Sequence, residues 1–224
     1  MRALLRTIAG VALALTVVPA VSAAGSDPGP TFRIDFSNPG LTPSQWTLEF
    51  HADGSGHFHS IRGNAAPQNL LLIEAPNIDR DVQVSPKFAE HAFQVAQHHK
   101  WFGTGCESHL KVAFQGWKKL SYTGPQGEGS CEFNYSRDAD IQQLGDSLVA
   151  VATTIIEGAR LETLLQHDPL GLDKEIQNVQ EAAGDGRAQQ ICSIRDILER
   201  LSEDPAVMER VRKRAKALLA HAEE

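Results

Sequence analysis

The aromatic residues of this 224-residue chain stop abruptly at position 135. All nine Phe, three Trp and two Tyr lie between Phe32 and Tyr135, where glycines are also crowded. From Ser136 onward there is no aromatic side chain, and the chain is rich in Ala, Leu, Glu and Gln. Strands favour aromatic residues, whereas Ala, Leu, Glu and Gln favour helices. The break therefore predicts two parts, a head domain over residues 30–135 and a tail over residues 136–224.

Periodicity within each part predicts an α+β fold. Apolar and polar residues alternate in the head, as in a strand with one buried face, and step by three and four in the tail, as in an amphipathic helix. We expect a small antiparallel β-sheet with one packed helix, followed by an all-α bundle of about four helices. About 200 residues are enough for one sizeable core or two small ones.

The first residues have the three-part plan of a secretory signal peptide. Arg2 and Arg6 precede an apolar run over residues 8–18, and small residues lead to Ala23. A membrane-spanning helix needs about 20 apolar residues, and this run is about half as long. We therefore expect a cleaved signal peptide over residues 1–24, and a soluble protein that works in the periplasm or outside the cell, with no membrane span after cleavage.

The charge of the chain argues against nucleic acid as a partner. The formal net charge is −7, and loss of Arg2 and Arg6 with the signal would take it to −9. Phosphate binding needs a concentrated positive face. The basic run over residues 210–216 is instead typical of the solvated face of a helix near its C-terminus.

A β-hairpin in the head gathers histidines. Residues 31–36 and 46–51 alternate between apolar and polar side chains, which predicts two strands. Asp53-Gly54-Ser55-Gly56, after the second, is a strong turn signal because glycine supplies positive φ. A register that pairs Phe50 with Phe58 keeps both in the core. It places His51 opposite His57 and Glu49 opposite His59 on the outward face.

This outward cluster predicts a transition-metal site, because imidazoles and carboxylates on alternate strand residues share one face. The candidate ligands are His51, His57, His59 and Glu49, and zinc, copper or nickel would suit them. The alternative is an ordinary polar outer face of a half-buried sheet. For the adjacent pair His98 and His99 we expect no shared ion, because neighbours on a helix point about 100 degrees apart.

The rest of the head contains one helix and further strands. Ser85-Pro86 predicts a helix start, because serine caps and proline suits the first helical position, and the helix should reach about Lys100. Alternation predicts strands over residues 110–115, 119–123 and 131–135. In an oxidising compartment Cys106 and Cys131 are the favoured disulfide pair, although Cys192 could replace either partner.

The head resembles uncharacterised exported bacterial domains from Trp46 to Tyr122. The resemblance lies in the D-G-x-G turn at residues 53–56, the Val84-Ser85 helix entry and the later Gly116-Trp117-Lys118-Lys119-Leu120 turn. It implies an α+β head and no particular activity.

The tail should form four helices with short connections, which favours an antiparallel bundle. The first begins at Ser136 or Asp138 and ends before Pro169. The other three begin at Asp173, around Ile191 and at Asp204-Pro205. Such a bundle could present a surface to a protein partner, or could simply pack on itself.

No sequence motif predicts catalysis. The chain lacks a G-x-S-x-G elbow, an H-E-x-x-H zinc motif, paired C-x-x-C motifs and the lysine of a phosphate-binding loop. The leading prediction is a non-catalytic binding or structural module. The alternatives are a transition-metal-binding protein or metalloenzyme using the hairpin histidines, and an inhibitor-like module acting through exposed loops.

Overall fold

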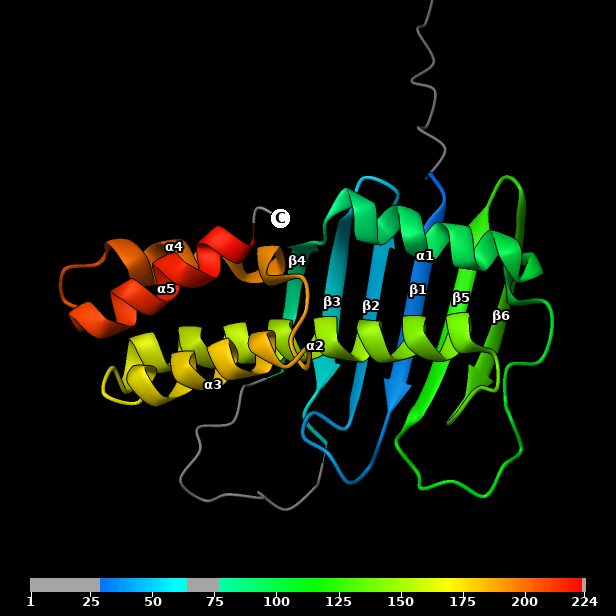
Figure 1. Cartoon of the computed structure of the whole chain (residues 1–224), viewed down its shortest axis with the longest axis horizontal. Helices are drawn as coiled ribbons and strands as arrows, with labels where there is room; N and C mark the ends of the chain where they lie inside the picture. Colours follow the sequence, from blue (N-terminus) through cyan, green and yellow to red (C-terminus); the bar gives the residue numbers. More distant parts are fainter. Residues whose placement is uncertain (1–28, 64–76, 223–224) are drawn as a thin grey trace, which may run out of the picture.

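A six-stranded antiparallel sheet and five α-helices make up the described part of the chain, residues 29–63 and 77–222, in a computed structural model (Figure 1). The fold class predicted from periodicity is confirmed. The predicted signal peptide lies outside the described residues. The strands are β1 (Thr31–Ser37), β2 (Gln45–His51), β3 (Ser55–Ile61), β4 (Asp79–Gln83), β5 (Trp117–Gly124) and β6 (Gly127–Phe133).

The strands run in the order β4-β3-β2-β1-β5-β6, so β4 and β6 are the edges of the sheet. Alternation gives the sheet one apolar face, on which Phe32, Ile34 and Leu48 are fully buried. Two helices, α1 (Pro86–His98) and α2 (Ala139–His167), cross this same face (Figure 1). The single packed helix expected over the sheet is therefore joined by the first helix of the tail.

The predicted register of the first hairpin is wrong by two residues. Phe58 pairs with Leu48, and Phe50 pairs with Gly56. The turn is tighter than expected, because the Gly54 amide donates to the His51 carbonyl at 3.0 Å and Gly54 adopts a φ of +83°. A shift of two residues keeps every side chain on its face, so Phe58 still reaches the core.

The strand predicted over residues 110–115 is absent. Leu110, Val112 and Phe114 are 46%, 40% and 50% exposed, and this segment forms no ladder. Strand β5 already pairs with β1 and β6, so no strand position remains beside it. Side-chain contacts hold the segment instead: the Gln115 amide donates to Asn134 Oδ1, and Asn134 Nδ2 donates to the Ala113 carbonyl.

The predicted helix start and disulfide are both confirmed. Ser85 caps α1 by accepting a hydrogen bond from the Phe88 amide at 3.2 Å. A disulfide joins Cys106 to Cys131 with 5.6 Å between their Cα atoms, and Cys192 is a free thiol. The bridge ties the irregular segment that precedes β5 to the edge strand β6.

The tail consists of α2, α3 (Leu172–Gly184), α4 (Arg195–Glu203) and α5 (Glu209–His221). There are also two short 3-10 helices: η1 (Lys100–Phe102) follows α1 in the head, and η2 (Ile191–Ile194) precedes α4. The tail has the four helices predicted for it, but the last begins at Glu209 rather than at Asp204-Pro205. No helix in the described ranges is long and apolar enough to cross a membrane.

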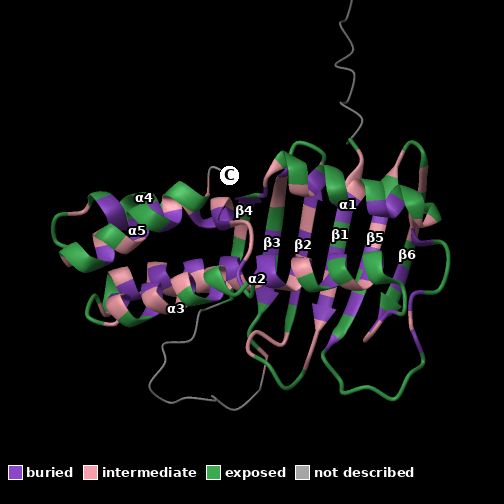
Figure 2. Cartoon of the chain, in the orientation of Figure 1, coloured by how far each residue is buried: buried purple, intermediate pink, exposed green. Residues whose placement is uncertain are grey.

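Helix α2 belongs to two cores. Leu144 and Leu148, in its first half, are fully buried in the sheet core with the strands and α1. Leu161 and Leu164, in its last turns, belong to the bundle core with α3, α4 and α5. Figure 2 shows buried positions recurring along the whole helix. The composition break at position 136 therefore does not separate the two cores in space.

Because α2 contributes side chains to both cores, we predict that the sheet and the bundle unfold together. Leu148→Ala and Leu161→Ala each remove a fully buried side chain and should cost about 2–5 kcal/mol. Denaturant unfolding followed by tryptophan fluorescence reports only on the head, because every aromatic residue lies at or before Tyr135. We expect Leu161→Ala to lower the fluorescence midpoint and the circular-dichroism midpoint equally. A fluorescence midpoint that Leu161→Ala leaves unchanged would show two independent units.

A partly buried cluster of charged side chains joins α2 to α3. Arg160 Nη1 lies 2.8 Å from Glu157 Oε2 and 3.1 Å from Glu175 Oε1. Burial, reinforced by a hydrogen bond with Glu175, raises the pKa of Glu157 to about 8. Two carboxyl groups thus share one guanidinium, and burial favours the neutral form of Glu157.

This cluster makes stability depend on pH. Because the folded pKa of Glu157 lies above the ordinary value of 4.5, the folded protein holds a proton that the unfolded chain releases. The stabilisation is complete below pH 4.5 and is lost as the pH rises through about 8. Urea unfolding at a series of pH values should show the wild type losing stability across this window relative to Glu157→Gln. The exposed Glu203→Gln is the matched control, and parallel curves for wild type and Glu157→Gln would refute the shift.

Candidate functional site

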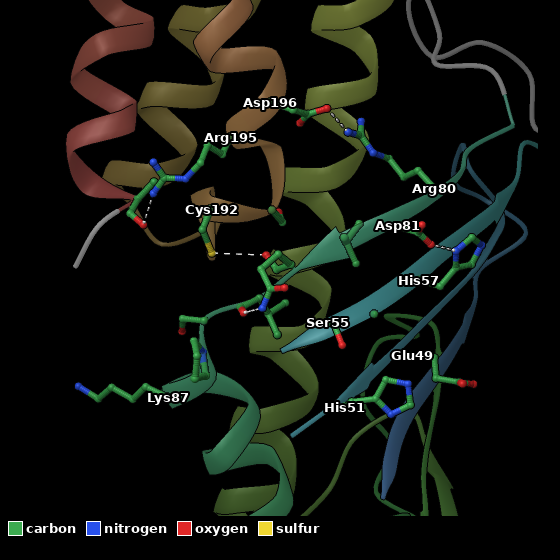
Figure 3. A pocket seen from close by; sticks show the side chains of 18 of the residues that line it. Glu49, His51, Ser55, His57, Arg80, Asp81, Lys87, Cys192, Arg195 and Asp196 are labelled. Carbon is green, nitrogen blue, oxygen red and sulfur yellow. Dashed lines mark hydrogen bonds and ion pairs between the residues drawn. The ribbon is translucent and has the colours of Figure 1, made fainter. Parts of the chain in front are cut away.

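A groove of about 1450 Å³ runs between the β4 edge of the sheet and the start of α4 (Figure 3). One wall comes from β2, β3 and β4, and the other comes from η2 and α4. The lining side chains used below are Glu49, His51, Ser55, His57, Arg80, Asp81, Cys192 and Asp196. A second hollow of about 450 Å³ lies further along β4, against α2.

Three of the four predicted metal ligands line this groove. Glu49, His51 and His57 lie on its sheet wall, whereas His59 lines a smaller hollow of about 240 Å³ on the same face of the sheet. The observed register pairs His57 with Glu49 and His59 with Thr47. His51 therefore does not face His57 as expected, and the hairpin metal site stays a prediction.

Strand β4 supplies two aspartates, Asp79 and Asp81, that were not among the predicted ligands. The Ser60 amide donates to the Ile78 carbonyl and the Val84 amide donates to the Gly54 carbonyl, so even-numbered residues of β4 bond to β3. Odd-numbered residues then form the non-hydrogen-bonded pairs, in which facing side chains lie closest. These pairs are His57 with Asp81 and His59 with Asp79.

The two histidines and two aspartates form an ion-paired cluster. His57 Nδ1 lies 2.9 Å from Asp81 Oδ1, and His57 Nε2 lies 3.0 Å from Asp79 Oδ1. His59 Nδ1 lies 3.0 Å from Asp79 Oδ2. The hydrogen bond to Asp81 raises the pKa of His57, with Asp79 adding to it, and the hydrogen bond from His59 lowers the pKa of Asp79. Both ring nitrogens of His57 thus face carboxylates, which favours the imidazolium over a metal-binding lone pair.

Because only the even-numbered residues of β4 bond to β3, the backbone groups of its odd-numbered residues lie on the open outer edge. The amides and carbonyls of Asp79, Asp81 and Gln83 point away from β3, toward the helices. The Gln83 carbonyl accepts the Cys192 thiol at 3.5 Å. The Asp81 amide and carbonyl have no hydrogen-bond partner among the described residues. An edge with free backbone groups can pair with another strand.

Arg80 links this edge to the tail. Its Nη2 lies 2.6 Å from Asp196 Oδ2 on α4 (Figure 3). Its Nη1 lies 3.6 Å from Glu162 Oε2 on α2. The Arg80 side chain is only 19% exposed, so water screens these contacts less than it screens a surface pair. Arg80 therefore fixes how close the bundle stands to β4.

Two nucleophilic side chains of the groove, Cys192 and Ser55, are not activated. Burial raises the pKa of the Cys192 thiol, which donates to the Gln83 carbonyl and lies 3.7 Å from Gln190 Oε1. The Ser55 hydroxyl donates to Asp53 Oδ1 at 2.6 Å rather than to a histidine. A reactive cysteine needs thiolate character, and a catalytic serine needs an adjacent base. Neither Cys192 nor Ser55 has these surroundings.

The chain matches no protein-family model, and no curated protein matches it. The chemistry of the groove is therefore the basis for assigning a function.

The cluster predicts an unusually basic His57. Because Asp81 raises the pKa of His57, its NMR titration midpoint should lie above the ordinary 6.5. Asp81→Asn should lower that midpoint, since it removes the largest cause of the shift. Asp53→Asn, which alters the neighbouring turn but not this pair, is the control. A wild-type midpoint at or below 6.5 would contradict the ion-paired geometry.

Proposed function

We propose that this protein is a non-catalytic binding module that takes an extended, basic peptide segment along the groove, by adding a strand to the β4 edge. The observation that carries the proposal is the outward backbone of β4 at Asp79 and Asp81, beside a groove of about 1450 Å³. Strand addition supplies affinity through main-chain hydrogen bonds and specificity through alternate side chains. Both walls take part, so the tail contributes to partner binding.

The charge around the edge favours a basic partner. Asp79 and Asp81 lie on one side of β4, and Glu162 and Asp196 lie beyond Arg80 on the other. Opposite charges on neighbouring strands stabilise their pairing, while like charges oppose it. Carboxylates on an edge strand also discourage pairing between copies of the chain, which itself carries a net charge of −7.

We also propose that the protein is exported and works in the periplasm or outside the cell. The arginine-flanked apolar run before Ala23 supports this proposal. The disulfide between Cys106 and Cys131 agrees with it, because paired thiols persist in oxidising compartments.

A metal site of Glu49, His51, His57 and His59 is the alternative proposal. It has less support, because carboxylates already occupy both ring nitrogens of His57 at hydrogen-bond distance.

A synthetic peptide that alternates lysine and valine tests strand addition, with a glutamate-valine peptide as the charge control. We expect the lysine peptide to bind, to slow hydrogen exchange of the Asp81 amide, and to lose affinity at high salt. Asp81→Pro should abolish binding, because proline removes the outward donor while an edge position still tolerates it.

Asp81→Asn is the matched variant. It keeps the backbone donor, so we expect it to weaken binding while leaving the exchange protection of the bound state in place. Unchanged binding to Asp81→Pro, or equal binding of the two peptides, would refute strand addition at β4.

A further inference from the structure

Two adjacent histidines meet an aspartate where α1 ends and α2 begins. His98 is the last residue of α1, and His99 is its C-cap, with φ −93° and ψ 28°. The chain leaves the helix at His99 and enters η1, whose three residues all have positive φ. The two rings lie 5.0 Å apart between centroids. The expectation that these neighbours diverge is wrong here, because it assumed that the helix continues.

The ligand atoms of this group converge on one point. His98 Nδ1 lies 3.7 Å from Asp140 Oδ2, and His99 Nε2 lies 3.9 Å from the same oxygen. Among residues 29–63 and 77–222, His98, His99 and Asp140 are the histidine, cysteine or acidic residues whose ligand atoms, one from each of the three, all lie within 4.8 Å of one another. The separations exceed hydrogen-bond lengths. Two ligands of a tetrahedral zinc ion lie about 3.4 Å apart, given zinc-nitrogen bonds of about 2.1 Å.

His99 carries a second, independent sign of a missing ligand. Its Nε2 is buried and has no hydrogen-bond partner in the described part of the chain, and its side chain is only 15% exposed. A second carboxylate oxygen, Asp138 Oδ1, lies 3.5 Å away and already accepts the amides of Asp140 and Ile141 as the cap of α2. A buried nitrogen left without a partner costs free energy that a bound ion would remove.

The surroundings tolerate a cation. The C-terminal end of α1 presents carbonyls with partial negative charge, and Asp138 and Asp140 offset the positive end of α2. His98 and Asp140 have side chains 77% and 56% exposed, so an ion can reach the site from solvent.

We propose that His98, His99 and Asp140 bind a divalent transition-metal ion of the zinc class, with water completing the coordination. Two imidazoles and one carboxylate suit zinc, copper(II) or nickel(II), whereas magnesium and calcium prefer oxygen ligands. The ion clamps the end of α1 to the start of α2, the two helices that cover the sheet. The site is remote in sequence from the groove and does not depend on the proposed function.

Zinc titration of the chelator-treated protein tests the site, by calorimetry and by thermal unfolding. We expect one zinc ion per chain and a higher unfolding midpoint, because a ligand that binds only the folded state stabilises it. His98→Ala and Asp140→Asn should each weaken zinc binding more than about tenfold, the range seen even for outer-shell partners. Both side chains are exposed, so the metal-free variants should unfold near the wild-type midpoint.

Matched controls separate this site from other histidines. His91→Ala removes an exposed histidine of the same helix, and the double variant His57→Ala with His59→Ala removes the hairpin pair; both should bind zinc as the wild type does. Magnesium should not replace zinc. The proposal is overturned if zinc does not bind, if His98→Ala and Asp140→Asn bind it normally, or if only the hairpin variant loses it.

Discussion

Helix α2 is longer than the sheet that it covers, and the rest of the molecule is arranged around that mismatch. Six strands spaced about 4.8 Å apart make a sheet about 24 Å wide. With 13 residues α1 is about 20 Å long and fits this width, whereas α2, with 29 residues, is about 44 Å long. The excess carries the apolar stripe of α2 beyond β4 (Figure 1), where α3, α4 and α5 must bury it.

The part of α2 that extends beyond β4 creates the groove. It holds η2 and α4 beside the β4 edge, close enough for Arg80 to reach Asp196 and Glu162 and for Cys192 to reach the Gln83 carbonyl. The opposite edge has no bundle beside it, and β6 is tied to the irregular segment by the disulfide. The two edges of one sheet therefore differ: the bundle flanks the first and leaves backbone groups open, and a covalent bond fastens the second.

The histidines show how one side chain serves different chemistry in different surroundings. His57 has a carboxylate at hydrogen-bond distance from each ring nitrogen, so the protonated ring is favoured and its pKa is raised. His99 has a buried nitrogen with no such partner among the described residues. In the first arrangement a proton on His57 satisfies both carboxylates, and in the second we propose that a metal ion binds that buried nitrogen of His99. Neither difference is visible in the residue types, which are histidine and aspartate in both places.

The sequence alone determined the elements whose signals are local. Alternation specified β1 and β2, the Ser85-Pro86 cap began α1, and three-and-four spacing specified the tail helices, because each pattern depends on neighbours along the chain. The tertiary structure decided what depends on distant partners. Strand β4 offers only Val82 as a buried apolar residue, so pairing with β3, rather than alternation, makes it a strand. The exposed segment over residues 110–115 alternates without becoming a strand, because β5, which follows it, already has a neighbouring strand on each side. The contacts of His57 with Asp79 and of His98 and His99 with Asp140 likewise needed the register and the helix ends, which only packing fixes.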